Sequence, residues 1–220
     1  MLLLSTIDEP VQEKTDISLM TVGVGVGNTQ KWEKGSFSIN TSYINLAPYL
    51  ELFEDRNTWN KPYQGASGEM VYRYKVNDSD LIKLYGAFSY SSFDLIQQDI
   101  NFDEGIHFAL ENRNLYFNGS YKGFLKNNWI LSTGFSFSND NTNLTIEDDL
   151  LKSNENSAHM KMTLRKRFNN RVKLNFGAEY FITDFNENYL STVNGNFKYG
   201  FKNNISGAFA EVDIFFSKSI

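Results

Sequence analysis

The chain has 220 residues, no cysteine and a formal net charge of −5, and its mean hydropathy is negative. The lack of cysteine excludes disulfides and thiolate metal sites, and the negative charge argues against a nucleic-acid-binding protein. A helical membrane protein would need about 20 continuous apolar residues, and no such run occurs. These features leave a β-rich domain with many aromatic residues.

Nine stretches in which hydrophobic residues occupy every second position follow one another along the chain. A period of two predicts β-strands, because successive side chains of a strand point to opposite faces. Each stretch has 8 to 10 residues, about the length that a tilted strand needs to cross a bilayer. The stretches are Met20–Gly27, Ser36–Tyr43, Glu69–Val76, Lys83–Ser91, Asn114–Tyr121, Trp129–Ser138, His159–Phe168, Val172–Tyr180 and Gly207–Phe216.

The connections between these stretches are alternately short and long. Short turns are predicted at 28–35, 77–80, 124–128 and 169–171, and long polar loops at 47–66, 93–111, 139–157 and 186–203. Outer-membrane β-barrels have short periplasmic turns and long extracellular loops. One face of the strands is apolar, whereas the other mixes Ser, Asn, Thr, Gly and charges that a dry core would not tolerate unpaired. The sequence therefore predicts an all-β, antiparallel, up-and-down transmembrane β-barrel segment whose mixed face lines a wet or plugged lumen.

Both ends of the chain predict a fragment. Met1–Leu4 lacks the basic region and the apolar length of a signal peptide. Counting from a first loop at Ser5–Thr15 gives nine strands, whereas bacterial single-chain barrels have an even number. The end at Phe215–Ile220 suggests a strand entering a periplasmic turn. We expect residues 1–220 to be a partial barrel domain, truncated at both ends.

Four segments resemble the barrel region of TonB-dependent outer-membrane receptors: Val22–Trp32, Ser42–Tyr63, Gly68–Asn101 and Gly207–Ile220. The resemblance implies part of a 22-stranded barrel with a plugged lumen, located in the cell outer membrane. It also implies a transporter that binds and imports a scarce nutrient, such as a ferric siderophore, cobalamin or an oligosaccharide. Its implied partners are outer-membrane lipid and the TonB system, reached through a plug domain that this sequence does not include.

Two other functions are compatible with a barrel. A small self-contained outer-membrane barrel or porin would need an even strand count and a signal peptide. A barrel enzyme would need a nucleophile, a histidine and an acid on its rim, and no such set is arguable with two histidines and no cysteine. The sequence therefore predicts no enzyme, no cofactor and no catalytic residue.

Aromatic residues in the predicted long loops are candidates for an external binding vestibule, because rings offer large contact area at low entropic cost. Alternatively, they pack the loops on one another or lie in the interfacial girdle, and we favour this second interpretation and name no ligand residues. These aromatics are Tyr49, Phe53, Trp59, Tyr63, Phe93, Phe102 and Phe108. The same loops are acidic, which indicates solvated tips or, less simply, cation attraction. The acidic residues are Glu51, Glu54, Asp55, Asp99, Asp103, Glu104, Glu147, Asp148 and Asp149.

Two motifs resemble cofactor or metal sites only superficially. The run Gly23–Asn28 resembles a dinucleotide-binding loop, but Asn28 stands where the third glycine is needed and no helix follows; small residues facing the lumen explain it better. His107 and His159 each lack a second metal ligand at a suitable spacing. We predict that they are ordinary loop and lumen residues.

Two polar clusters leave alternatives open. Asn139–Asn143 with Glu147 and Asp148 offers oxygen ligands for calcium, but it lacks the glycine of an EF-hand loop, and a solvated loop tip is the simpler interpretation. Basic residues flank the turn at 169–171 and either bind lipid phosphate or a periplasmic partner, or form a rim whose side chains snorkel. They are Arg165, Lys166, Arg167 and Arg171.

Overall fold

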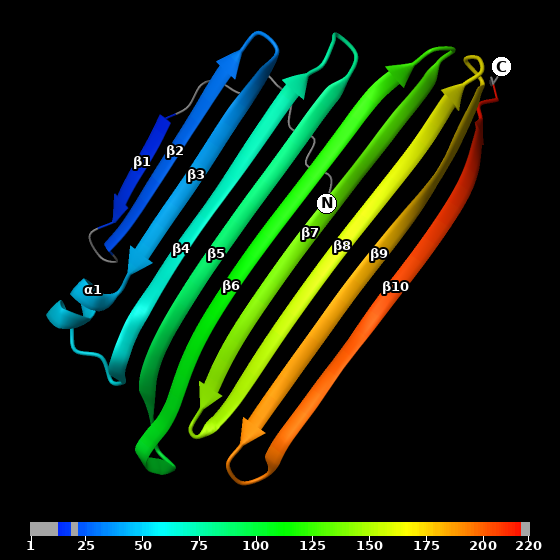
Figure 1. Cartoon of the computed structure of the whole chain (residues 1–220). Coiled ribbons are helices and arrows are strands. Elements are labelled where there is room, and N and C mark those ends of the chain that lie inside the picture. Colours follow the sequence, from blue (N-terminus) through cyan, green and yellow to red (C-terminus); the bar gives the residue numbers. More distant parts are fainter. Residues whose placement is uncertain (1–12, 19–21, 217–220) are drawn as a thin grey trace.

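The computed structural model describes residues 13–18 and 22–216. The expectations for Met1–Leu4, for Met20, for most of the first loop and for residues 217–220 lie outside this part of the chain. The described residues form ten antiparallel strands that lie side by side in one sheet, in chain order. Figure 1 shows a single curved layer with β1 at one edge and β10 at the other.

The elements are few and long, and most strands exceed the length of their predicted stretches. The bounds are β1 Glu13–Ser18, β2 Val22–Trp32, β3 Gly35–Asn45, α1 Ala47–Leu52, β4 Thr58–Lys75, β5 Leu81–Asp99, β6 Phe102–Leu125, β7 Trp129–Ile146, β8 Asp149–Arg167, β9 Val172–Ser191 and β10 Gly195–Ile214.

The nine predicted strands correspond to β2–β10, and the predicted up-and-down antiparallel order is confirmed. A short tenth strand, β1, overlaps the segment that was expected to be the first loop. It pairs with β2 from Glu13 opposite Asn28 to Ser18 opposite Gly23. The prediction missed β1 because its six residues are mostly polar, so no apolar alternation marks them.

The predicted long loops are wrong at three of their four positions. The segments 93–111, 139–157 and 186–203 are strand almost throughout, and the chain reverses tightly at 100–101, 147–148 and 192–194. These segments are rich in polar residues and therefore resemble loops in the sequence, but each one continues the backbone pairing of its strand with both neighbours or with the single neighbour at the edge. Only the segment 46–57, which contains α1, is a true loop. This loop and the three tight reversals lie at the same end of the strands, at the bottom of Figure 1, and we call it the far end.

At the opposite end of the strands, which we call the turn end, lie the short connections that the sequence predicts. They are at 33–34, 76–80, 126–128 and 168–171. Asn127 and Asn128 both have φ of 61°. Asparagine enters this left-handed region more readily than other non-glycine residues, because its short polar side chain bonds locally. Two consecutive residues of this type produce a tight reversal between β6 and β7.

The sheet has no hydrophobic core. Among the described residues no apolar side chain is buried, and large ones such as Met160 (60%), Phe135 (50%) and Val26 (50%) remain exposed. No helix in the described ranges is long and apolar enough to cross a membrane. A single layer with this much exposed apolar surface must be covered by something other than its own side chains.

Candidate functional site

Strand register divides the sheet into two faces. Paired residues of neighbouring strands point to the same side, so Phe135, Met160 and Tyr180, which are successive partners on β7, β8 and β9, share a face. We call this the outer face and the opposite one the inner face. On β7 the outer face is apolar or small from Trp129 to Phe137 and becomes polar at Asn139.

This apolar band slants across the strands. On β5 the outer face stays apolar up to Tyr90, whereas on β9 it ends at Ile182, whose row reaches β5 at Gly86. From β9 to β5 the border of the band toward the far end therefore shifts by four residues, from the row of Gly86 to the row of Tyr90, which is about 14 Å along a strand. The two strands are four strand spacings apart, or about 19 Å. A flat hydrocarbon layer crossed by tilted strands produces such a slant. The ratio of the shift along the strand to the distance across the strands corresponds to a tilt of about 35°, within the range of outer-membrane barrels.

The height of the band agrees with a bilayer. Residues Trp129–Phe137 extend about 27 Å along β7, and a tilt of about 35° reduces this length to about 22 Å along the membrane normal, before the ends of the terminal side chains are added. The apolar band of transmembrane barrels has a height of about 25 Å. The outer face therefore has both the slant and the height of a surface that contacts lipid.

Opposite this band, the inner face is lined by small polar side chains that hydrogen-bond across strands. Ser42 and Ser67 lie 2.7 Å apart through their hydroxyls, and the Asn40 amide donates to Glu69 at 3.0 Å. The hydroxyl of Tyr85 also donates to Glu69, at 3.2 Å. Such pairs keep the polar groups satisfied while leaving a water-compatible wall, which supports the predicted wet or plugged lumen.

Toward the far end the two faces exchange polarity. Six residues in one unbroken row on the inner face are all apolar or aromatic, and we call them the inner row. The inner row consists of Phe93, Leu110, Leu144, Leu151, Tyr189 and Phe197, one from each of β5–β10. Their immediate neighbours on the outer face form an equally continuous polar row, the outer row, which consists of Ser92, Glu111, Asn143, Lys152, Asn188 and Lys198.

The inner row is bordered by further aromatic rings. Tyr189 stacks on Phe197 with ring centroids 6.2 Å apart, and Phe185 stacks on Phe201 at 5.4 Å. The inner face near the far end therefore offers an apolar surface, half-buried on β5–β9 and exposed on β10, at the height where the outer face is polar. An apolar or aromatic molecule that enters from the far end meets this surface before the polar lumen.

Most members of the inner row were not among the sequence candidates. The signal that would have found them is a change of phase within one strand. On β9 the even positions are apolar up to Ile182, whereas beyond it the rings of Phe185 and Tyr189 stand at odd positions. The change is hard to recognise in the sequence because it falls in polar segments that are typical of loops.

The aromatic candidates named from the sequence are distributed over several places. Tyr49 and Phe53 stack on each other at α1, with ring centroids 4.8 Å apart. Trp59 contacts Phe93 of the inner row edge-on at 6.5 Å. The remaining candidates do not join one cluster: Tyr63 lies on β4, Phe102 is exposed at the start of β6, and Phe108 lies on the inner face beside Leu95 and Ile146.

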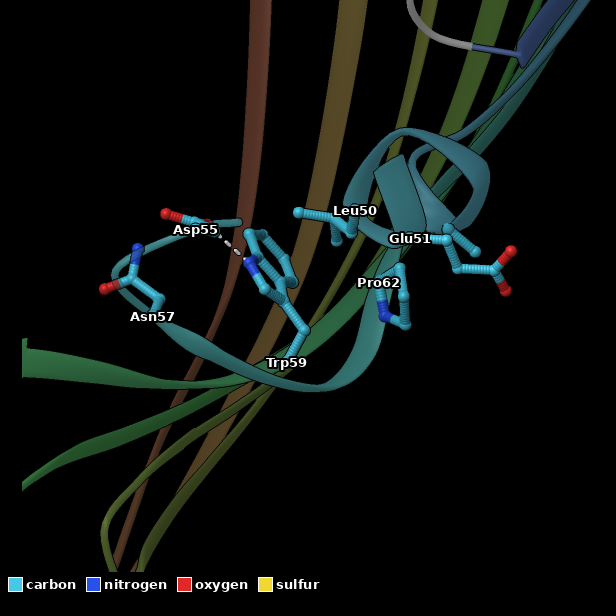
Figure 2. Close-up of a pocket in the computed structure, with 7 residues that line it drawn as sticks. Leu50, Glu51, Asp55, Asn57, Trp59 and Pro62 are labelled. Atoms are coloured by element: carbon cyan, nitrogen blue, oxygen red, sulfur yellow. Dashed lines mark hydrogen bonds between the residues drawn. The ribbon is translucent and has the colours of Figure 1, made fainter. Parts of the chain in front are cut away.

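A shallow pocket of about 290 Å³ lies between α1 and the start of β4. Figure 2 shows the Trp59 ring between Asp55 and Leu50, with the indole N–H donating to Asp55 at 2.6 Å. This hydrogen bond lowers the pKa of Asp55 below its ordinary value. The pocket thus holds a fixed carboxylate beside a ring, at the same end of the sheet as the inner row.

The two histidines lie on opposite faces. His107 Nε2 lies 2.9 Å from Asp94 on the outer face. His159 is on the inner face, 3.4 Å from Glu179 and beside the Phe181 ring. Within the described ranges no three His, Cys, Asp or Glu side chains are placed to hold a metal ion.

The calcium candidates and the acidic tips do not form one site either. Asn139 and Asn141 lie on the outer face, whereas Asp140 lies on the inner face and accepts a hydrogen bond from Asn114 at 3.0 Å. Glu147 accepts one from the backbone N–H of His107 at 2.7 Å. The acidic residues predicted in loops are divided among α1 and the tips of two hairpins.

Of the four basic residues at the turn end, only Lys166 has its side chain on the outer face within the sheet. Its ammonium lies 5.0 Å from the centre of the Trp129 ring and 4.9 Å from that of Phe168. Arg165 faces inward, and Arg167 donates to the Asn170 side chain at 2.9 Å within the turn. This arrangement fits a lysine that snorkels among interfacial aromatics.

The run Gly23–Asn28 is part of β2. Gly25 faces inward and pairs with Ser42, whereas Val24 and Val26 face outward. The structure therefore supports small inner-face residues here instead of a phosphate-binding loop.

Comparison with known proteins gives structural matches only. No protein-family profile matches the sequence, and no curated protein matches it. The siderophore receptor PiuA from Acinetobacter baumannii is 10% identical, with a TM-score of 0.62 over 88% of this chain and 40% of that one. The ferric yersiniabactin uptake receptor FyuA from Yersinia pestis is 9% identical, with a TM-score of 0.54 over 92% of this chain and 37% of that one. The chain spans less than half the length of either receptor, and it has the fold of part of a TonB-dependent receptor barrel, with the sheet left open.

Proposed function

We propose that this chain forms part of the wall of a TonB-dependent receptor in the cell outer membrane, which binds and imports a scarce nutrient. The observation that carries the proposal is the slanted apolar band of the outer face, because its height and tilt fit a bilayer while the opposite face is polar. The receptor would couple to the TonB system through a plug domain, as the resemblance of the sequence implies. The proposed activity of this receptor is transport and not catalysis.

The inner row is the proposed contact for the nutrient. It lies on the lumen side near the far end, and its rings offer stacking surfaces that need little ordering on binding. Of the two structures compared above, one is a siderophore receptor and the other is a ferric yersiniabactin uptake receptor. A ferric siderophore is therefore the first ligand to test, followed by cobalamin and oligosaccharides.

A small closed barrel or porin is the alternative function. Closure of the sheet on itself would require β1 to pair with β10. These two strands are the opposite edges of the sheet in the described ranges, and every residue of β10 is exposed. This arrangement favours a wall that continues into further strands.

The experiment is uptake of radiolabelled ligands, first a panel of iron-labelled ferric siderophores and then labelled cobalamin and oligosaccharides, by nutrient-starved cells that express the full-length protein or lack it. We expect uptake of at least one ferric siderophore only in cells that carry the protein and an intact TonB system. Uptake that persists without TonB would contradict the proposal and indicate passive diffusion through a porin. The absence of uptake across the siderophores, cobalamin and oligosaccharides would also contradict it.

The contribution of the inner row is tested by Phe197→Ala, with Asn196→Ala as the matched control. The two residues are neighbours on β10, but only Phe197 faces inward. Loss of one buried ring contact weakens binding by roughly tenfold, so we expect this increase in the dissociation constant for Phe197→Ala and little change for the control. Equal effects of the two variants would exclude the inner row as the ligand contact.

A further inference from the structure

The outer face above the apolar band is built for a polar partner. Across β6–β10 the three rows that contain Asn139, Asn141 and Asn143 carry amide and charged side chains at every position except Leu115 and Gly200, and they continue directly from the apolar rows below. On β8 these polar positions extend from Asn156, next to the last apolar residue Ala158, up to Lys152. This part of the wall stands on the same side as the lipid-facing band and immediately above it.

Four asparagines on this surface form a closed ring of hydrogen bonds. Asn139 donates to Asn156 at 2.7 Å, Asn156 to Asn154 at 2.7 Å, Asn154 to Asn141, and Asn141 to Asn139 at 2.6 Å. Each amide uses one N–H and one lone pair in the ring and keeps one of each for a partner. The ring is therefore a rigid patch of alternating donors and acceptors, which is complementary to sugar hydroxyls.

The charges on this surface leave two lysines uncompensated. Both carboxylates are engaged, since Glu111 lies 2.7 Å from Arg113 and Asp184 lies 2.9 Å from Lys202. The other two cations are Lys152 and Lys198, which flank Asn188 in the outer row and form no ion pair among the described residues.

These two lysines are about two strand spacings apart, or roughly 10 Å between backbones, so their long side chains can converge on one anionic group. A phosphate group matches this spacing and charge.

The height of the polar surface distinguishes between possible lipids. From Ala158 to Lys152 the strand rises about 20 Å along its axis, or about 17 Å along the membrane normal at a tilt of about 35°. Phospholipid headgroups occupy only about 5–8 Å on each side of the hydrocarbon core. A surface this tall matches a larger headgroup, made of several sugars.

We propose that this surface binds the phosphorylated oligosaccharide headgroup of an outer-leaflet glycolipid, with Lys152 and Lys198 on a phosphate and the asparagine ring on sugar hydroxyls. The proposal rests on the outer-membrane location in the proposed function and on the far end, where the sequence predicts the extracellular connections, facing outward, but not on transport of any nutrient. The glycolipid would fix the height of the wall in the membrane from the outside.

The test measures binding of purified lipopolysaccharide, its enzymatically dephosphorylated form and phosphatidylglycerol to the full-length protein in detergent. Binding is followed by the concentration dependence of thermal unfolding, and folding of each variant is verified by heat-modifiable gel migration. We expect lipopolysaccharide to bind more tightly than either other lipid. We expect Lys152→Gln with Lys198→Gln to weaken this binding by roughly tenfold, and the double arginine variant to retain it.

The matched control is Lys166→Gln, which removes an outer-face lysine from the turn end, where the opposite leaflet lies. Its affinity for lipopolysaccharide should stay unchanged. Equal affinity of the double glutamine variant and the unaltered protein would overturn the proposal, as would equally tight binding of phosphatidylglycerol or an equal loss in the control. Nutrient uptake is measured separately in the same variants, so a failure of transport with intact glycolipid binding contradicts only the proposed function.

Discussion

At the scale of single residues, Gly35 shows how closely two strands approach at the turn end. A Cβ at this position would clash with the backbone carbonyl of Arg73 and lie 2.9 Å from the Trp32 ring. Backbone cannot move aside as a flexible side chain can, so we expect Gly35→Ala to lower the free energy of unfolding by about 1–3 kcal/mol. Denaturant unfolding of the full-length protein, followed by tryptophan fluorescence, measures this change.

Gly207→Ala is the control for this prediction. Its Cβ would meet only the Glu179 side chain at 3.6 Å, an ordinary contact. We expect a change within about 0.5 kcal/mol. If both alanine variants are equally stable, the close approach at Gly35 does not constrain the sheet.

Asp80 links the turn between β4 and β5 to the end of β6 through hydrogen bonds. Its carboxylate accepts hydrogen bonds from the backbone N–H of Phe124 at 2.7 Å, from the Asn77 amide at 2.8 Å and from the Tyr121 hydroxyl at 3.2 Å. These donors, Phe124 first, hold the pKa of Asp80 below its ordinary value of 3.8.

Because the pKa of Asp80 is lower in the folded state than in the unfolded state, its stabilising effect is present above pH 3.8 and is lost as the pH falls through the folded pKa. We predict that Asp80→Ala increases hydrogen exchange of the Phe124 amide at pH 7 and that the difference from the unaltered protein shrinks in acid. Asp78→Ala removes a carboxylate from the same turn and should leave this exchange unchanged. A difference that is the same at every pH would show that the charge of Asp80 plays no part.

At the scale of strands, the slant of the apolar band predicts different depths for residues in one row. Phe88 on β5 and Asn156 on β8 belong to the same row on the outer face, through Leu115 and Asn139. If the strands are tilted, this row crosses the border of the apolar band, so that Phe88 lies in the hydrocarbon layer and Asn156 lies outside it.

The chain has no cysteine, so single replacements can be labelled without background. We predict that a membrane-impermeant thiol reagent applied to intact cells modifies Asn156→Cys and spares Phe88→Cys. The same Phe88→Cys variant should react after denaturation, which confirms that the thiol is present. Equal labelling of both variants on intact cells would contradict the tilt.

The strands could be predicted from the sequence wherever one face contacts lipid. Between Trp129 and Phe137 the contrast between faces is strong, so alternation marks β7 clearly, and the same is true of β2–β10 near the turn end. Between the band and the far end the outer face contacts water, so a polar residue on this face has no desolvation cost. The far halves of β6–β10 therefore have no simple alternation, and their extended shape depends on backbone pairing that a single sequence does not display.

The site was predictable only in outline for the same reason. A mixed inner face was expected from the serines, glycines and asparagines of the short stretches. The inner row was not, because Leu110, Leu144 and Leu151 are separated in sequence and meet only through the register of β6, β7 and β8. Cross-strand assembly of distant residues is a property of the folded sheet.

At the scale of the whole molecule, the sheet has two free edges. β10 has 20 residues, and antiparallel pairing satisfies only alternate backbone groups on the side of β9. Roughly half of its N–H and C=O groups therefore point away from the sheet. Those within the hydrocarbon layer lack water as a partner, and each costs several kcal/mol there.

We therefore predict that the 220-residue chain, expressed by itself, aggregates or fails to insert into a membrane. Several unpaired groups on each edge add up to a penalty of tens of kcal/mol, more than the 5–15 kcal/mol by which folded proteins are ordinarily stable. The measurement is refolding into liposomes, followed by heat-modifiable gel migration and protease digestion. The full-length protein is the control and should give a heat-modifiable, protease-resistant band. The same band from the chain alone would contradict the prediction, and it would mean that the edges of β1 and β10 pair with each other or with a second copy once lipid is present.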